Sequence, residues 1–216
     1  MPAYIIVDYG RAIKRPFSDA KKLVIGIIVS IIPFVNFIAA GYHLACAKTA
    51  MKKKFELPEW EDLGGLFVKG VVAEVIAILY IILPMAVMVI AGVNAVLSLV
   101  TAMASGAQGA GMGAALLGAG AGFLLGAILM LIMLYLLPAA ILGYVKSDKF
   151  GAAFRLGEVF GKAFRVDYFV AFVFVALYGG IISVILSIVP YFGTMVAWFI
   201  SGVTAMTVFA EVYESK

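Results

Sequence analysis

The longest uncharged stretch of this chain determines its class. Residues 75–145 contain no Asp, Glu, Lys or Arg, although about 20 apolar residues are enough to cross a bilayer as a helix. The composition agrees, because 65% of the residues are hydrophobic and only 13% are charged, against roughly half and a quarter in soluble domains. The sequence therefore predicts an all-α, polytopic integral membrane protein.

Four apolar blocks follow one another, at residues 23–47, 71–100, 114–145 and 166–210. Each block contains one proline, which lacks an amide hydrogen and predicts a kink, a helix end or a turn. These prolines are Pro33, Pro84, Pro138 and Pro190. The last block is too long for one span, and we expect it to divide into two helices at Pro190.

The first block allows two interpretations, namely one span kinked at Pro33 or a short helical hairpin that turns there. All but one of the 16 basic residues lie in residues 1–22, 47–70 and 146–165, and the positive-inside rule places such segments in the cytoplasm. Residues 1–22 share that side only if the chain returns, which favours the hairpin. Its arms of about 15–17 residues would be roughly 23–25 Å long.

We therefore expect a single transmembrane domain over residues 1–216, with about six membrane-embedded helices arranged as three helical hairpins plus short interfacial amphipathic helices. We expect it in the cell membrane, with both termini cytoplasmic. The expected order is an interfacial N-terminal helix (1–22), a first hairpin (23–54), an interfacial loop or helix (55–70), a second hairpin (71–145) with a Gly/Ala-rich external loop near 94–113, a basic amphipathic segment (146–165) and a third hairpin (166–216).

Basic and aromatic residues alternate in the two amphipathic segments, which is typical of helices that lie on a membrane surface. The alternative is that these segments are connectors held at the interface by snorkelling cations. The predicted partners are membrane lipids with anionic headgroups, together with another copy or another membrane protein, and not nucleic acid. The candidate headgroup contacts are Arg11, Lys14, Arg15, Lys149, Arg155, Lys162 and Arg165.

Small residues recur at every fourth position in two blocks, where they would let helix backbones approach closely. The partner helix could belong to the same chain or to another subunit. The candidate packing positions are Gly118, Gly122, Gly126, Ala197, Ser201 and Ala205.

Ionisable residues inside a membrane are candidates for function, and here they are Glu74 and His43. Glu74 lies one turn inside its span, which favours an interfacial role. His43 lies three residues before Cys46, and the chain has no further His or Cys, so a metal site would be incomplete. The sequence predicts no catalytic, cofactor-binding or metal site.

Several short motifs resemble a known family. Arg15-Pro16-Phe17, Ile32-Pro33, Gly41-Tyr42, Leu57-Pro58-Glu59-Trp60 and Gly70 are similar to the prokaryotic, mainly archaeal, membrane-protein family catalogued as domain of unknown function four thousand and thirteen. Gly143-Tyr144, residues 152–154 and Asp167-Tyr168 resemble it more loosely. The resemblance implies a small polytopic membrane protein without an assigned activity.

The sequence therefore leaves three functions open. The favoured one is non-enzymatic, namely membrane organisation, lipid binding or service as a membrane subunit for a partner. The alternative is a small transporter or channel for an ion or small solute, which would need a polar cavity near the midplane. The second alternative is an intramembrane enzyme.

Overall fold

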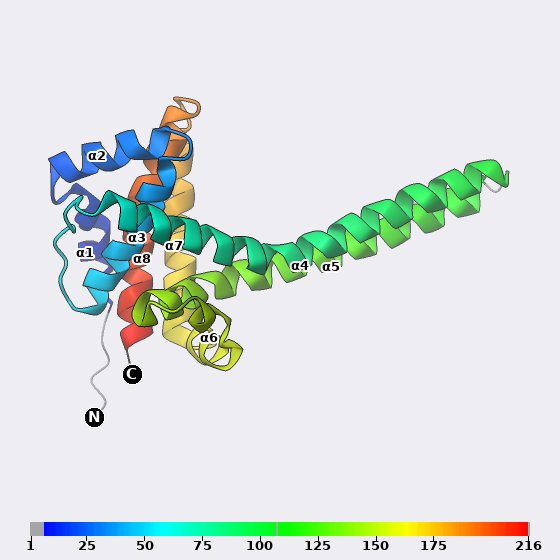
Figure 1. Ribbon diagram of the computed structural model, residues 1–216. Coiled ribbons are helices and arrows are strands. Elements are labelled where there is room, and N and C mark those ends of the chain that lie inside the picture. The colour runs from blue at the N-terminus through cyan, green and yellow to red at the C-terminus, as the bar shows by residue number, and fades with distance from the viewer. Residues whose placement is uncertain (1–6, 107, 216) are drawn as a thin grey trace. The chain divides into compact units, whose positions relative to one another are not determined.

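A computed structural model describes residues 7–106 and 108–215, which form helices and no strand (Figure 1). The chain divides into two compact units, Met1–Ile76 with Pro138–Lys216 (unit 1) and Ala77–Leu137 (unit 2). The expectation of a single transmembrane domain stays a prediction. In order, the elements are α1 (Tyr9–Lys14), η1 (Arg15–Phe17), α2 (Ala20–Ile31), α3 (Asn36–Met51), α4 (Leu63–Ala104), α5 (Gln108–Ser147), η2 (Phe150–Phe154), α6 (Leu156–Ala163), α7 (Val166–Leu186) and α8 (Phe192–Glu214).

Four of the described helices are long and apolar enough to cross a membrane, which are α4, the Met112–Ser147 part of α5, α7 and α8. The α2 and α3 helices have only 12 and 16 residues, or about 18 and 24 Å, against a hydrocarbon core of about 30 Å. The break between them makes the first apolar block two helices rather than one kinked span. Among the described residues, four helices are thus long and apolar enough to span a membrane, and the arrangement of about six membrane-embedded helices in three hairpins stays a prediction.

The Gly/Ala-rich external loop expected near residues 94–113 is wrong. Helix α4 continues to Ala104 and α5 begins at Gln108, with Gly106 between them at a φ of 72°. Helix is favoured here because alanine, leucine and methionine are strong helix formers, and because a backbone in lipid must satisfy its own hydrogen bonds. Pro84 and Pro138, where the sequence allowed a kink, a helix end or a turn, both lie inside continuous helices.

Unit 2 consists of the α4 and α5 segments that flank this turn. They pack through small residues, because a Cβ added to Gly122 would lie 2.3 Å from the Ala91 Cβ atom. A Cβ at Gly126 would likewise lie 2.2 Å from the Met88 Cγ atom. Large apolar side chains cover the outside, such as Leu117 at 78% exposure, so this surface suits lipid.

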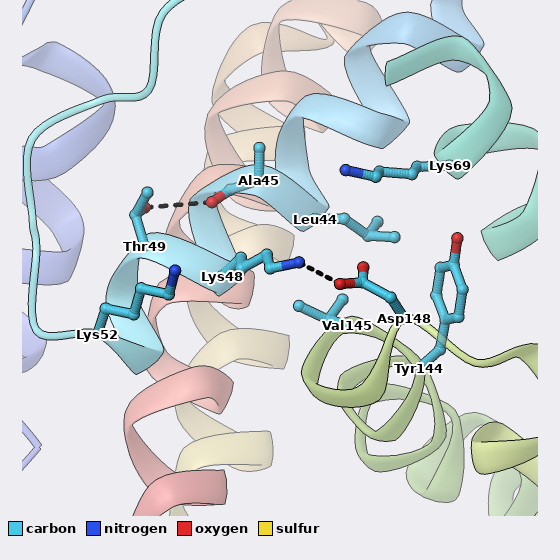
Figure 2. Close-up of a pocket in the computed structure, with 9 residues that line it drawn as sticks. All are labelled: Leu44, Ala45, Lys48, Thr49, Lys52, Lys69, Tyr144, Val145 and Asp148. Carbon is cyan, nitrogen blue, oxygen red and sulfur yellow. Dashed lines mark hydrogen bonds and ion pairs between the residues drawn. The ribbon is translucent and has the colours of Figure 1, made fainter. Parts of the chain in front are cut away.

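Unit 1 is organised around α8, which packs against α1, α2, α3 and α7. In its most apolar stretch 61% is buried inside the protein, against 6% for α7. Helix α7 therefore leaves most of its surface for lipid, whereas α8 is central. The C-terminal ends of α3 and α5 and the first turns of α4 lie around one space in this unit (Figure 2).

Two glycines let α3 and the start of α4 pack backbone against backbone. A Cβ at Gly70 would lie 1.8 Å from the Phe37 carbonyl oxygen, and one at Gly41 would lie 1.9 Å from the Leu66 carbonyl oxygen. No side chain fits at either position. Close approach of this kind replaces the hydrophobic drive that lipid does not supply.

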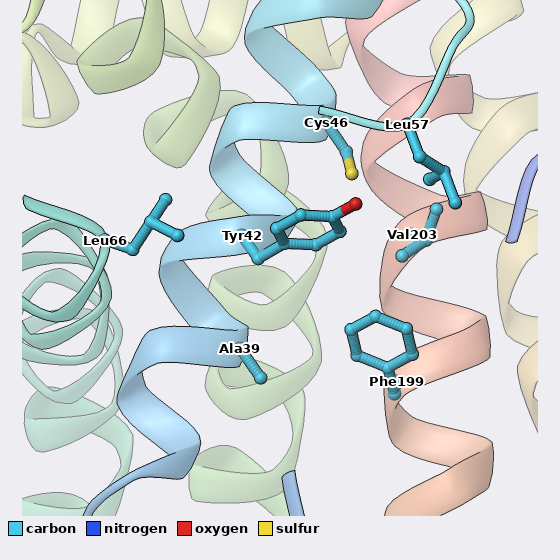
Figure 3. Close-up of a cluster of buried hydrophobic side chains, with 7 residues drawn as sticks. All are labelled: Ala39, Tyr42, Cys46, Leu57, Leu66, Phe199 and Val203. Atoms are coloured by element: carbon cyan, nitrogen blue, oxygen red, sulfur yellow. The ribbon is translucent and has the colours of Figure 1, made fainter. Parts of the chain in front are cut away.

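Beside this contact, the core of unit 1 gathers around Tyr42 (Figure 3). Its ring stacks on Trp60 with centroids 3.8 Å apart, and its hydroxyl donates to the Pro58 carbonyl at 2.8 Å. The Trp60 Nε1–H donates to the Lys22 carbonyl at 3.2 Å. The segment before α4 is therefore fastened to the protein interior rather than left as a surface loop.

Arg15 joins four segments of unit 1. It is only 2% exposed, and burial lowers the pKa of its guanidinium, which nevertheless stays charged because arginine does not deprotonate in proteins. Its three nitrogens donate over 2.6–3.5 Å to the carbonyls of Cys46, Lys54, Phe55 and Glu56 and to the hydroxyls of Thr49 and Thr207. These bonds correct the expectation that Arg15 contacts a lipid headgroup, because the protein takes all of its donors.

We expect Arg15→Lys to lower the free energy of unfolding by about 3 kcal/mol, because an ammonium cannot reach all six acceptors and leaves buried carbonyls unpaired. Thermal unfolding in detergent should then show a Tm roughly 6–12 °C lower. The matched control is Arg155→Lys. Its side chain is 54% exposed and pairs with Glu158, which is 58% exposed, so the change should cost no more than about 1 kcal/mol. Equal melting of the two variants would contradict this role for Arg15.

A second prediction tests the glycine contact between α3 and α4. Gly70→Ala should destabilise unit 1 by about 1–3 kcal/mol, because the added methyl overlaps the Phe37 carbonyl. The control, Gly64→Ala, lies in the first turn of the same helix, where a Cβ would meet no described atom within 4 Å. It should be neutral or stabilising by up to about 1 kcal/mol. A Gly70→Ala protein that melts no lower than Gly64→Ala would disprove the close contact.

Candidate functional site

A basic pocket of about 200 Å³ lies in unit 1 at the polar ends of α3 and α5 (Figure 2). Its wall carries three lysines and one acid, and its remaining residues are polar or aliphatic. We call this site the basic pocket, and its lining residues are Leu44, Ala45, Lys48, Thr49, Lys52, Lys69, Tyr144, Val145 and Asp148.

Helical spacing brings the lysines to this pocket. Lys48 and Lys52 are four residues apart at the end of α3, so they lie on one face. Lys69 comes from the second turn of α4. Asp148 follows the end of α5 with a φ of 52°, and its amide bonds to the Tyr144 carbonyl at 2.8 Å. Its carboxylate accepts a hydrogen bond from the Lys48 ammonium.

The pocket is positive on balance. Three lysines and one aspartate line it, and the C-terminal ends of α3 and α5 each add about half a negative charge, which leaves roughly one positive charge. Arg15 also offsets the end of α3, because it bonds to the Cys46 carbonyl there. Among the described residues, Lys52 and Lys69 form no ion pair. The pocket can therefore accept an anion.

A second group of cations lies where α8 ends. Lys162 donates to the Tyr213 carbonyl at 2.6 Å, and Arg165 donates to the Ser215 carbonyl at 2.6 Å and pairs with Asp167. Burial, followed by the nearby charge of Arg165, lowers the pKa of Lys162. Both side chains cap the helix C-terminus. Lys162 and Arg165, both predicted headgroup contacts, thus already bond to groups of the protein itself.

The remaining predicted headgroup contacts lie at the surface. Lys14 and Lys149 are exposed, Arg155 is exposed and pairs with Glu158 at 3.3 Å, and Arg11 lies over the Phe55 ring at 3.5 Å. Near Arg155, the apolar residues Leu156, Phe160 and Phe164 of this segment are 54%, 38% and 75% exposed. Exposed aromatics beside cations are typical of a segment at a membrane interface.

The candidate intramembrane polar residues differ in burial. Glu74 is exposed. His43 is 5% exposed and lies against Gly202, where a Cβ would be 2.2 Å from the imidazole. Four buried polar atoms of unit 1 have no hydrogen-bond partner within the described part of the chain, namely His43 Nε2, Tyr178 OH, Ser201 Oγ and Thr204 Oγ1. Among the residues searched, no group of three metal-ligating side chains occurs.

The predicted packing positions are partly in contact. Gly122 and Gly126 meet α4 within unit 2, whereas a Cβ at Gly118 would meet no described atom within 4 Å, which does not fit the packing expected there. In unit 1, Ala197 is 1% exposed. Ser201 lies 3.8 Å from the Cβ position of Gly179, and Ala205 is half-buried. The contacts that the structure describes are within the chain.

Sequence reasoning did not select Lys48, Lys52 or Lys69 as site residues. The signal was present, since five of the basic residues lie in residues 47–70, but it served only to orient the chain. Asp148 and Tyr144 are separated from these lysines by the whole of unit 2 in sequence. Only the folded chain brings them together.

Comparison with known proteins gives one match. Residues 25–191 match a family described as "Protein of unknown function (DUF4013)". No curated protein and no solved structure matches the chain. The match covers the basic pocket but ends just before α8 begins.

Proposed function

This chain belongs to the family described as "Protein of unknown function (DUF4013)", and since that description assigns no activity, we propose from the site that it is a non-enzymatic multi-pass membrane protein that binds anionic lipid headgroups. Four apolar helices are compatible with a multi-pass membrane protein. The basic pocket is the proposed binding site. The positive-inside rule predicts that this side faces the cytoplasm.

One observation carries the proposal, which is the excess of ammonium groups in the basic pocket. Lys52 and Lys69 line it without an ion pair in the described part of the chain, and such cations at a membrane surface attract anionic lipids. Leu44, Ala45 and Val145 give the same pocket an aliphatic wall, which suits the glycerol end of a lipid. The exposed aromatics near Arg155 support a position at the interface.

The test is lipid binding to the purified full-length protein in nanodiscs, followed by native mass spectrometry. Phosphatidylglycerol should be retained in preference to phosphatidylcholine. The double variant Lys52→Gln with Lys69→Gln should reduce that preference by about tenfold or more, since each surface cation contributes about 1 kcal/mol. Lys21→Gln is the single-charge control, because Lys21 is exposed on α2 outside the pocket. Retention that is the same for both lipids would rule the proposal out.

A second candidate function, transport of an ion or small solute, is favoured by the unpartnered polar atoms of His43, Tyr178, Ser201 and Thr204. Buried polar groups of this kind commonly hold water, and water inside a membrane can line a path. They lie on α3, α7 and α8 of unit 1.

Flux measurements separate the two candidates. Under our first proposal, proteoliposomes containing the parent protein should show proton and cation flux at the baseline of empty vesicles. Flux above that baseline that is lost in Ser201→Ala with Thr204→Val would instead favour transport. Glu74→Gln is the control. The Glu74 carboxylate is exposed, unlike those four buried atoms, so this substitution should leave any such flux unchanged.

A further inference from the structure

We propose that the basic pocket selects a phosphomonoester, the doubly charged terminal phosphate of a lipid headgroup or of a small soluble molecule, over a singly charged phosphodiester. This inference rests on the proposed function and names the chemical class of its ligand. Four features of the pocket support it, which are its charge, its donors, its single acid and its size.

The two ammonium groups without an ion pair favour a dianion. Of its three ammonium groups, that of Lys48 is paired with Asp148, whereas Lys52 and Lys69 have no ion pair within the described residues. Each of these two ammonium groups can pair with one negative charge of a phosphomonoester, which carries about −1.5 to −2 at pH 7. A phosphodiester carries one negative charge and can pair with only one of them.

The donors of the pocket are also suited to a terminal phosphate. Each lysine offers three N–H donors, and the Tyr144 hydroxyl offers one more, while a phosphomonoester presents three acceptor oxygens. Figure 2 shows Lys69 reaching from α4 toward α3. Thr49 is not one of these donors, because its hydroxyl accepts from Arg15 at 2.6 Å and donates to a carbonyl of its own helix.

Asp148 is the competitor built into the pocket. Its carboxylate is 56% exposed and the Lys48 ammonium is 37% exposed, so water already screens their attraction. A phosphate that carries more charge than a carboxylate can therefore replace Asp148 as the partner of Lys48. A monoanionic diester has no such advantage over the carboxylate.

The size of the pocket is sufficient for a phosphate group. Its volume is about 200 Å³, whereas a single water needs only about 10–15 Å³ of such space. A larger pocket of about 440 Å³ lies at the end of α8, but its cations already have partners within the protein. Lys162 and Arg165 donate to the Tyr213 and Ser215 carbonyls, and Lys146 pairs with Glu214 at 2.7 Å.

The experiment is calorimetric titration of the full-length protein in neutral detergent with four probes: short-chain phosphatidic acid, short-chain phosphatidylglycerol, short-chain phosphatidylcholine and inorganic phosphate. We expect phosphatidic acid to bind at least about fivefold more tightly than phosphatidylglycerol, since one further charge contributes about 1 kcal/mol. Inorganic phosphate that binds as tightly as phosphatidic acid would identify a soluble ligand, and weaker binding would identify a lipid. Both results support a phosphomonoester.

Three variants test the residues. Lys52→Gln and Lys69→Gln should each weaken phosphatidic acid about fivefold, and Asp148→Asn should strengthen it by removing the competitor. Lys21→Gln should change nothing. Phosphatidic acid should bind more weakly at pH 5 than at pH 7.5, because the second phosphate pKa is about 6. Lysines with a purely structural role would not make the affinity for phosphatidic acid depend on pH in this way. Thermal unfolding of each variant checks that it is folded.

The outcomes separate this inference from the proposed function. Equal affinity for phosphatidic acid and phosphatidylglycerol, with both above phosphatidylcholine, would overturn the selectivity while leaving anionic headgroup binding intact. Equal affinity for all three lipids would overturn both. Unchanged binding of phosphatidic acid in Lys52→Gln and Lys69→Gln would place the ligand outside the basic pocket and would also overturn the inference.

Discussion

The buried guanidinium of Arg15 is the interaction on which unit 1 depends. A charge removed from water is costly unless hydrogen bonds replace its hydration, and here the replacements come from the end of α3, the segment before α4 and Thr207 of α8. The same side chain thereby fixes the last turns of α3, from which Lys48 and Lys52 project. The geometry of the basic pocket is therefore a consequence of where Arg15 is held.

The two units use helix packing differently. In unit 1, Gly41 and Gly70 bring backbones into direct contact, and the stacked rings of Tyr42 and Trp60 fill the space beside them. Unit 2 has two helices that touch through small residues such as Gly122, and it exposes large aliphatic side chains for lipid. The four buried polar atoms without a hydrogen-bond partner in the described part of the chain, and the basic pocket, both belong to unit 1.

The cations of this protein divide into structural and free groups. Arg15 and Arg165 satisfy backbone carbonyls, and Lys162 does the same at the end of α8. Lys52 and Lys69, in contrast, form no ion pair among the described residues. Lys52 and Lys69 are therefore better suited to bind a ligand, because a cation already bonded to the protein would have to give up those bonds.

The sequence by itself determined the helical nature of the chain, and Pro33 and Pro190 mark turns between helices. It predicted the membrane class from the uncharged residues 75–145, and the four long apolar helices are compatible with that class. It could not determine that Gly/Ala-rich residues near 94–113 continue two helices, because that depends on a lipid-exposed backbone satisfying itself. Nor could it separate Arg15 from Lys52, because both are basic residues beside apolar segments. Only the tertiary structure decided that one is buried among six acceptors while the other lines a pocket with Asp148, a residue distant in sequence.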